Sequence, residues 1–208
     1  APASGKTLCM LQVACAAASK VEAWIEGQQD ASQPLIPVFM RAAELSALLD
    51  GREENIKSLN DLAEIFLRDR YKSRIEIAEV MTRVVRLHGA LVLVDGLDEA
   101  QTDHRVLIEV CVDKACRDSQ WAIVSSRESA FELSRKCCRL RRMAPVRMKG
   151  LDDTRRDQFI QKRMGSSPQS AEAFRAQLTL VAHQFPELES NPFMLALMIE
   201  VFKKDRNL

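Results

Sequence analysis

Short apolar runs alternate with helical patterns along the first two thirds of this 208-residue chain. Runs of strand length lie at 35–40, 90–94 and 121–125, and a weaker one lies at 145–148. Apolar residues spaced three to four apart predict helices at about 5–27, 103–116 and 128–136, and two more between 58 and 88. Strands that alternate with helices favour crossover connections, so the order predicts an α/β fold with a parallel sheet.

Individual residues refine this order. Pro37 lies inside the first apolar run and favours an edge strand, because proline cannot donate a backbone hydrogen bond. Ser58 is placed to begin one helix, and Ser73 with Glu76 has the spacing of a capping box at the start of another. The uniformly apolar run 90–94 is typical of a buried parallel strand.

The last quarter of the chain shows helical patterns only. Asp152, Pro168 and the pair Asn191-Pro192 each stand where a helix can begin. We therefore predict two parts, an α/β domain at 1–149 and an all-helical subdomain at 150–208.

Composition excludes few functions. Lys and Arg number 30 against 29 Asp and Glu, and 47% of residues are hydrophobic, so neither nucleic acid nor an anionic membrane is expected as a partner. No apolar run is expected to reach the roughly 20 residues needed to span a bilayer. The six cysteines lack paired metal-ligand spacing, which argues against zinc. Reduced cysteines are usual in the cytoplasm, which is the predicted location.

Residues 1–7, Ala-Pro-Ala-Ser-Gly-Lys-Thr, resemble the end of a phosphate-binding loop that opens a helix. Lys6 is expected to reach the β- and γ-phosphates and Thr7 to place its hydroxyl on Mg²⁺. Backbone groups from Ala3, Ser4 and Gly5 onward, through Leu8, are predicted to contact the nucleotide. The motif's first glycine would precede Ala1, so we expect a fragment of a larger protein.

A second group of polar residues follows the run 90–94. Asp95 stands at the carboxyl end of this strand, where a carboxylate can bind Mg²⁺ close to phosphates. Asp98 and Glu99 come directly after it, placed to orient or deprotonate an attacking water. An acidic turn that caps the next helix is the alternative interpretation of Asp98 and Glu99.

Arg127 follows the next strand and is expected at the same sheet edge, where a guanidinium can stabilise the γ-phosphate. The alternative is a surface arginine that pairs with Glu128 or Asp98. Two histidines, His88 and His104, flank the acidic strand end and are interpreted as surface or capping residues. The basic stretch 135–147 is interpreted as a solvated helix and loop.

Together these residues resemble the NACHT domain of the signal-transduction ATPases with numerous domains. The resemblance rests on Gly-Lys-Thr at 5–7, Leu-Val-Asp-Gly-Leu-Asp-Glu-Ala at 93–100, Ser-Ser-Arg at 125–127 and Asn-Pro-Phe at 191–193. It implies a P-loop NTPase fold that lacks its first strand and a slow ATPase that acts as a signalling switch. ATP (or GTP) with Mg²⁺ is the implied cofactor, and Pro192 is implied to contact the adenine.

The resemblance also implies protein partners or self-association through flanking domains, of the kind found in innate immune receptors. Because the implied first strand is central to the sheet, we expect the isolated fragment to be poorly stable and to bind nucleotide weakly. Two further functions stay open: another P-loop NTPase, such as a AAA-type remodeller or a kinase, and a nucleotide-binding scaffold without turnover.

Overall fold

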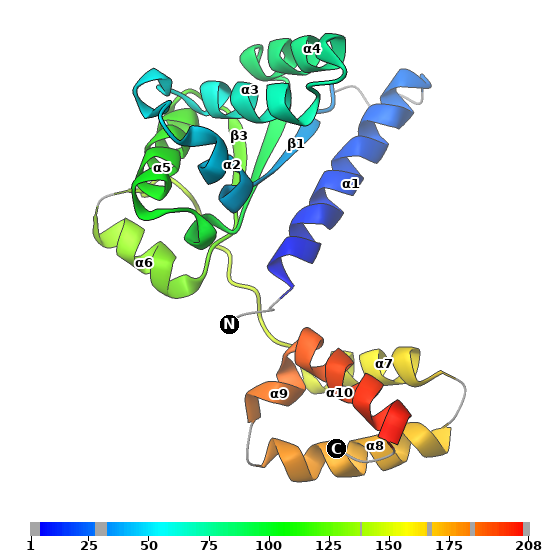
Figure 1. Cartoon of the computed structure of the whole chain (residues 1–208). Helices are drawn as coiled ribbons and strands as arrows, with labels where there is room; N and C mark the ends of the chain where they lie inside the picture. The colour runs from blue at the N-terminus through cyan, green and yellow to red at the C-terminus, as the bar shows by residue number, and fades with distance from the viewer. Residues whose placement is uncertain (1–4, 28–32, 138, 166–167, 184–185, 206–208) are drawn as a thin grey trace. The chain divides into compact units, whose positions relative to one another are not determined.

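The chain forms two compact units. The computed structural model describes residues 5–27, 33–137, 139–165, 168–183 and 186–205. One unit is Thr7–Pro145, which contains every described strand, and the other is Val146–Leu208 with Ala1–Lys6. Figure 1 shows the strands of the first unit and the helices α7 to α10 of the second. The change of unit after Pro145 lies four residues ahead of the predicted boundary at 149/150.

A parallel sheet confirms the predicted α/β class. Its three strands are β1 (Ile36–Arg41), β2 (Ala90–Asp95) and β3 (Trp121–Val124), in the order β1-β2-β3. The central strand β2 is buried at every position except Leu91, as its uniformly apolar sequence predicts. Pro37 lies in β1, which is an edge strand among the described residues.

Among the described residues, six helices and two short 3-10 turns complete the first unit. They are α1 (Lys6–Ile25), α2 (Ala42–Leu49), α3 (Leu59–Arg70), α4 (Ile75–Arg86), α5 (Thr102–Arg117) and α6 (Glu128–Lys136), with η1 (Glu53–Asn55) and η2 (Leu97–Glu99). Most were predicted from apolar spacing. The sequence interpretation missed α2, an eight-residue helix that follows β1 directly.

The main core lies on one face of the sheet. Residues that alternate along the strands, such as Val38, Val92 and Val124, pack with apolar side chains of α2, α3 and α5. This alternation follows from the pleat of a strand, which sends successive side chains to opposite faces. On the other face Trp121 and Ile123 of β3 are 62% and 38% exposed. The two faces of this edge strand are therefore covered unequally.

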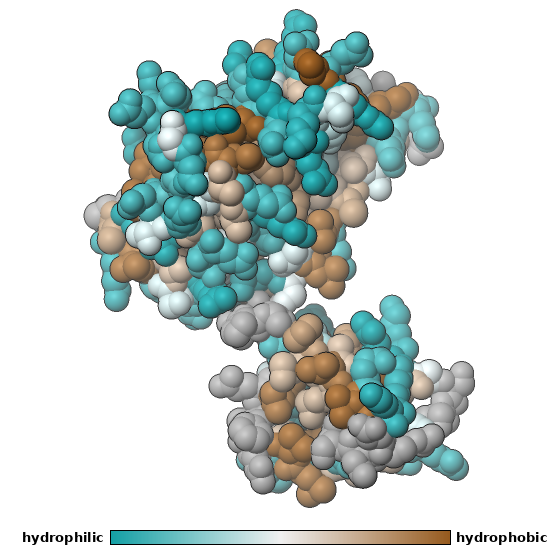
Figure 2. All heavy atoms as spheres, viewed as in Figure 1, coloured by the Kyte–Doolittle hydropathy of each residue, from teal (hydrophilic) through white to brown (hydrophobic). Residues whose placement is uncertain are grey.

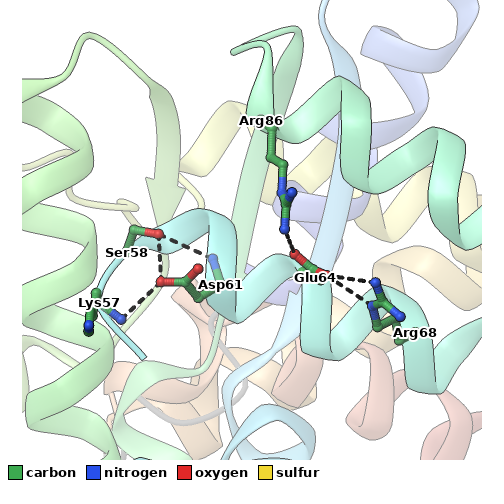
Figure 3. A network of polar contacts seen from close by, with 6 residues as sticks. All are labelled: Lys57, Ser58, Asp61, Glu64, Arg68 and Arg86. Atoms are coloured by element: carbon green, nitrogen blue, oxygen red, sulfur yellow. Dashed lines mark hydrogen bonds and ion pairs between the residues drawn. The ribbon is translucent and has the colours of Figure 1, made fainter. Parts of the chain in front are cut away.

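Polar contacts fix the start of α3 and join it to α4 (Figure 3). Ser58 caps α3, as predicted, by accepting a hydrogen bond from the Asp61 backbone N–H, and Asp61 accepts one from the Ser58 hydroxyl in return. Further along, Glu64 pairs with Arg68 in its own helix and with Arg86 of α4. The Glu64–Arg86 pair thus holds α3 against α4, the next helix in the sequence.

The capping box predicted at Ser73 does not form. Helix α4 begins at Ile75 after Arg74, and no side chain caps it. The Arg74 N–H instead donates to the Tyr71 carbonyl in the turn that leaves α3. Ser73 lies within that turn and does not cap α4, so the prediction of a Ser73–Glu76 capping box was wrong.

Helix α1 is long and apolar enough, by length and composition, to cross a membrane, whereas the sequence interpretation expected no such segment. A single helix of this kind near the start of a chain is weak support for a membrane span, because core helices and signal sequences share its properties. Met10 is its only buried residue among those described, and Leu8 and Ile25 are 62% and 72% exposed.

In the second unit the described residues form a small bundle of four helices. These are α7 (Asp153–Met164), α8 (Pro168–Ala182), α9 (Pro186–Ser190) and α10 (Pro192–Asp205). Phe174 of α8 and Phe202 of α10 meet edge to face in its core, with ring centroids 5.4 Å apart. Figure 2 shows that hydrophobic side chains also reach the surface of this unit.

The start of the second unit corrects one prediction. The segment 145–148 is not a strand, since residues 144–150 have no regular structure and Val146 is 91% exposed. A four-residue run that contains a proline offers too few backbone donors to hold a place in a sheet. Asp152 caps α7, as predicted, by accepting from the Arg155 N–H, and a side chain at Gly150 would clash with Ser190.

The cysteines allow a direct test of burial. Cys111 of α5 is 1% exposed, and desolvation raises the pKa of its thiol to about 11. At pH 8 roughly one Cys111 in a thousand would be the reactive thiolate. We expect iodoacetamide to label exposed Cys9, Cys15 and Cys137 in the folded protein and to spare Cys111 until urea unfolds it. Peptide mapping by mass spectrometry measures this, and rapid labelling of Cys111 in the native protein would contradict it.

Candidate functional site

Asp95 is the centre of the predicted site. It is the last residue of β2, is 6% exposed, and each of its carboxylate oxygens accepts a hydroxyl hydrogen bond. Thr7 Oγ1 donates to Oδ2 over 2.7 Å, and Ser125 Oγ donates to Oδ1. The structure thus brings together the first turn of α1 and the carboxyl ends of β2 and β3.

The start of α1 carries the other predicted phosphate ligands. Gly5 has a φ of +81°, a conformation that residues other than glycine rarely adopt, and Lys6 is the first residue of the helix. The side chain of Leu8 is largely exposed. Ala3 and Ser4, for which backbone contacts to the nucleotide were also predicted, lie outside the described residues.

A tight turn follows Asp95 and connects it to Ser125. Gly96 is left-handed, with φ 71° and ψ 45°, and its N–H donates to Ser125 Oγ over 2.9 Å. The side chain of Glu99 folds back over this glycine: an added Cβ would lie 3.0 Å from the Glu99 carboxyl carbon. Glycine at position 96 therefore permits both the backbone turn and the placement of Glu99.

Asp98 and Arg127 are partners across the ends of β2 and β3. The Arg127 N–H donates to Asp98 Oδ1 over 2.8 Å, and its Nε lies 2.9 Å from Oδ2. The Asp98 side chain is 11% exposed and that of Arg127 is 56% exposed. Arg127 therefore lies at the predicted sheet edge and makes one of the two ion pairs that the alternative interpretation named.

These contacts explain how several carboxylates share one strand end. Asp95 is stabilised by two hydroxyl donors and Asp98 by a guanidinium, whereas Glu99 is exposed and solvated. A hydroxyl oxygen close to a carboxylate oxygen forms a pair of hard ligands of the type that Mg²⁺ prefers. Thr7 and Asp95 supply such a pair, with the two oxygens 2.7 Å apart.

Pro192 belongs to the helical unit. It is the first residue of α10, and Asn191 caps this helix: its Oδ1 accepts from the N–H groups of Phe193 and Met194 over 3.0 and 3.3 Å. The Asn-Pro pair therefore has a local structural role at a helix start. An adenine contact by Pro192 stays a prediction.

Sequence reasoning missed two buried polar residues of α5. His104 was interpreted as a surface or capping residue, yet it is 4% exposed and contacts Ser46 of α2. Its spacing from Ile108, Cys111 and Val112 places it on the buried helix face, a signal that was present in the sequence. Glu109 is fully buried and pairs with Arg139, which lies within the supposedly solvated basic stretch.

Comparisons with family models, curated proteins and solved structures found no match to this chain.

Proposed function

We propose that this chain is the nucleotide-binding part of a slow ATPase switch of the NACHT type, which binds ATP or GTP with Mg²⁺. The observation that supports it most is the 2.7 Å hydrogen bond between Thr7 Oγ1 and Asp95 Oδ2. The two residues are 88 positions apart in sequence, and both are predicted Mg²⁺ ligands. In such a switch the nucleotide state sets the arrangement of the protein, and hydrolysis releases it.

The contacts also suggest different roles for the two following carboxylates. Asp98 already accepts two interactions from Arg127, so we assign it the task of orienting this guanidinium toward a γ-phosphate. Glu99 carries an exposed carboxylate beside the end of β2, and we assign it to the attacking water as the general base. Mg²⁺, when bound, would neutralise phosphate charge, and Thr7 and Asp95 would hold it.

Substitution of Lys6 tests the proposal. We expect Lys6→Ala to lower the affinity for Mg²⁺–ATP about 10- to 100-fold, because charged hydrogen bonds to phosphate contribute about 1.5–3 kcal/mol. Binding is measured by titration with a fluorescent ATP analogue. Lys20→Ala is the matched control, since this exposed lysine lies in the same helix α1. Equal ATP affinity of the Lys6 and Lys20 variants would contradict the proposal.

A further inference from the structure

Asp50, Glu53 and His104 converge on one point of the first unit. Asp50 and Glu53 come from the segment after α2, and His104 comes from the first turn of α5. His104 Nε2 lies 3.0 Å from Glu53 Oε1 and 3.7 Å from Asp50 Oδ1. One ligand atom of each residue falls within 4.8 Å of the other two. None of the three belongs to the site around Asp95.

The His104 ring is held by a hydrogen bond at Nδ1, the ring nitrogen that does not face the two carboxylates. The side chain of His104 is 5% exposed, and its Nδ1 lies 2.9 Å from Oγ of the buried Ser46. Ser46 Oγ also accepts the N–H of Gln101, the residue before α5, over 3.1 Å. A histidine that binds a metal through one ring nitrogen usually makes such a hydrogen bond with the other. The Ser46 hydroxyl can rotate to accept a hydrogen bond from the Nδ1–H group, which leaves the Nε2 lone pair free.

The carboxylates form the solvent side of the cluster. The side chains of Asp50 and Glu53 are 68% and 44% exposed, so an ion can enter from water. Gly51 fixes Glu53 because its N–H donates to Oε1 over 3.2 Å. Tetrahedral coordination at bond lengths near 2.0–2.2 Å separates neighbouring ligand atoms by about 3.3–3.6 Å. The separations of 3.0 and 3.7 Å from His104 Nε2 lie on either side of that range.

We propose that Asp50, Glu53 and His104 bind a divalent transition-metal ion of the zinc class, with water as the remaining ligand. An imidazole nitrogen with two carboxylates favours such an ion over Mg²⁺ or Ca²⁺, which prefer all-oxygen ligands. The bound ion would join the segment after α2 to the first turn of α5. Because α5 follows η2, the metal would also stabilise the turn that carries Asp98 and Glu99.

Titration of the purified chain with Zn²⁺ and Co²⁺ tests this proposal. Cysteines are blocked first with N-ethylmaleimide, because exposed Cys9, Cys15 and Cys137 would otherwise compete for either ion. Calorimetry with Zn²⁺ is expected to show one saturable site. The visible absorption of bound Co²⁺ is expected to have the intensity of a four-coordinate nitrogen and oxygen site.

Three variants decide the assignment. Asp50→Asn and Glu53→Gln are each expected to weaken Zn²⁺ binding at least about tenfold, a typical loss for residues that shape a metal site. Both positions are exposed, so the variants should stay folded. Glu54→Gln is the matched control, because Glu54 is an exposed neighbour in the same 3-10 turn. The proposal would be overturned if Zn²⁺ titration showed no saturable site, or if all three variants bound Zn²⁺ with equal affinity. The contacts of His104 with Asp50 and Glu53 would then be simple ion pairs.

Discussion

Replacement of Glu109 by alanine is expected to lower the free energy of unfolding of the Thr7–Pro145 unit by about 3–5 kcal/mol. Glu109 is fully buried on α5 and is the charged centre of a small network. It pairs with Arg139 beyond α6, accepts a hydrogen bond from the buried Ser134, and lies 3.5 Å from Arg105 Nε. The hydrogen bond to Glu109 also raises the pKa of the Arg139 guanidinium.

The large effect follows from what the alanine variant leaves behind. Arg139 would lose the carboxylate with which it pairs, and Arg105 Nε, which already has no hydrogen bond, would lose the carboxylate 3.5 Å away. An uncompensated buried charge costs more than the intact pair contributes. Because the network joins α5 to α6 and to the chain after it, this loss should loosen the whole side of the sheet next to β3.

Urea unfolding followed by circular dichroism measures the change. Glu109→Gln is expected to lose less than Glu109→Ala, since the amide oxygen can still accept from Ser134. Glu79→Ala, an exposed carboxylate on α4, is the control and should change stability by less than about 0.5 kcal/mol. A Glu109→Ala variant as stable as this control would show that the network contributes little.

Much of the fold can be predicted from local patterns. The strand β2 is uniformly apolar and is followed by acidic residues, which indicates both its burial and the residue at which it ends. Ser58, Asp152 and Asn191 cap helices where the sequence places caps, because capping depends on a few neighbouring backbone groups. Such features are local, so one sequence is enough to predict them.

Long-range polar contacts could not be predicted in the same way. Ser125 appeared in the sequence only as part of a strand end, yet it donates to Asp95 and accepts from the Gly96 N–H. The pairs Ser46 with His104 and Glu109 with Arg139 join residues 58 and 30 positions apart. A buried carboxylate or imidazole is stable only with its partner, and periodicity does not reveal which distant residue that partner is.

Glu99→Gln is expected to slow ATP hydrolysis by about 10²–10⁴-fold while it leaves ATP affinity nearly unchanged. The glutamine has the same shape and can occupy the same place over Gly96, but it cannot accept a proton from water. The affinity should persist because Thr7 and Asp95, which we assign to Mg²⁺, are untouched. Single-turnover assays with radiolabelled ATP measure the chemical step, and the fluorescent analogue measures binding.

Two further variants separate the roles within the acidic turn. Asp98→Asn removes the charge that pairs with Arg127, so we expect a smaller loss in rate than for Glu99→Gln, with weaker ATP binding as the guanidinium loses its orientation. Asp103→Asn, an exposed carboxylate of α5 near the same turn, should match the unmodified protein. If Glu99→Gln hydrolyses ATP as fast as Asp103→Asn, Glu99 is not the base. If the unmodified protein binds ATP without any turnover, the chain is a nucleotide-binding scaffold, and its acidic turn serves only to position Arg127.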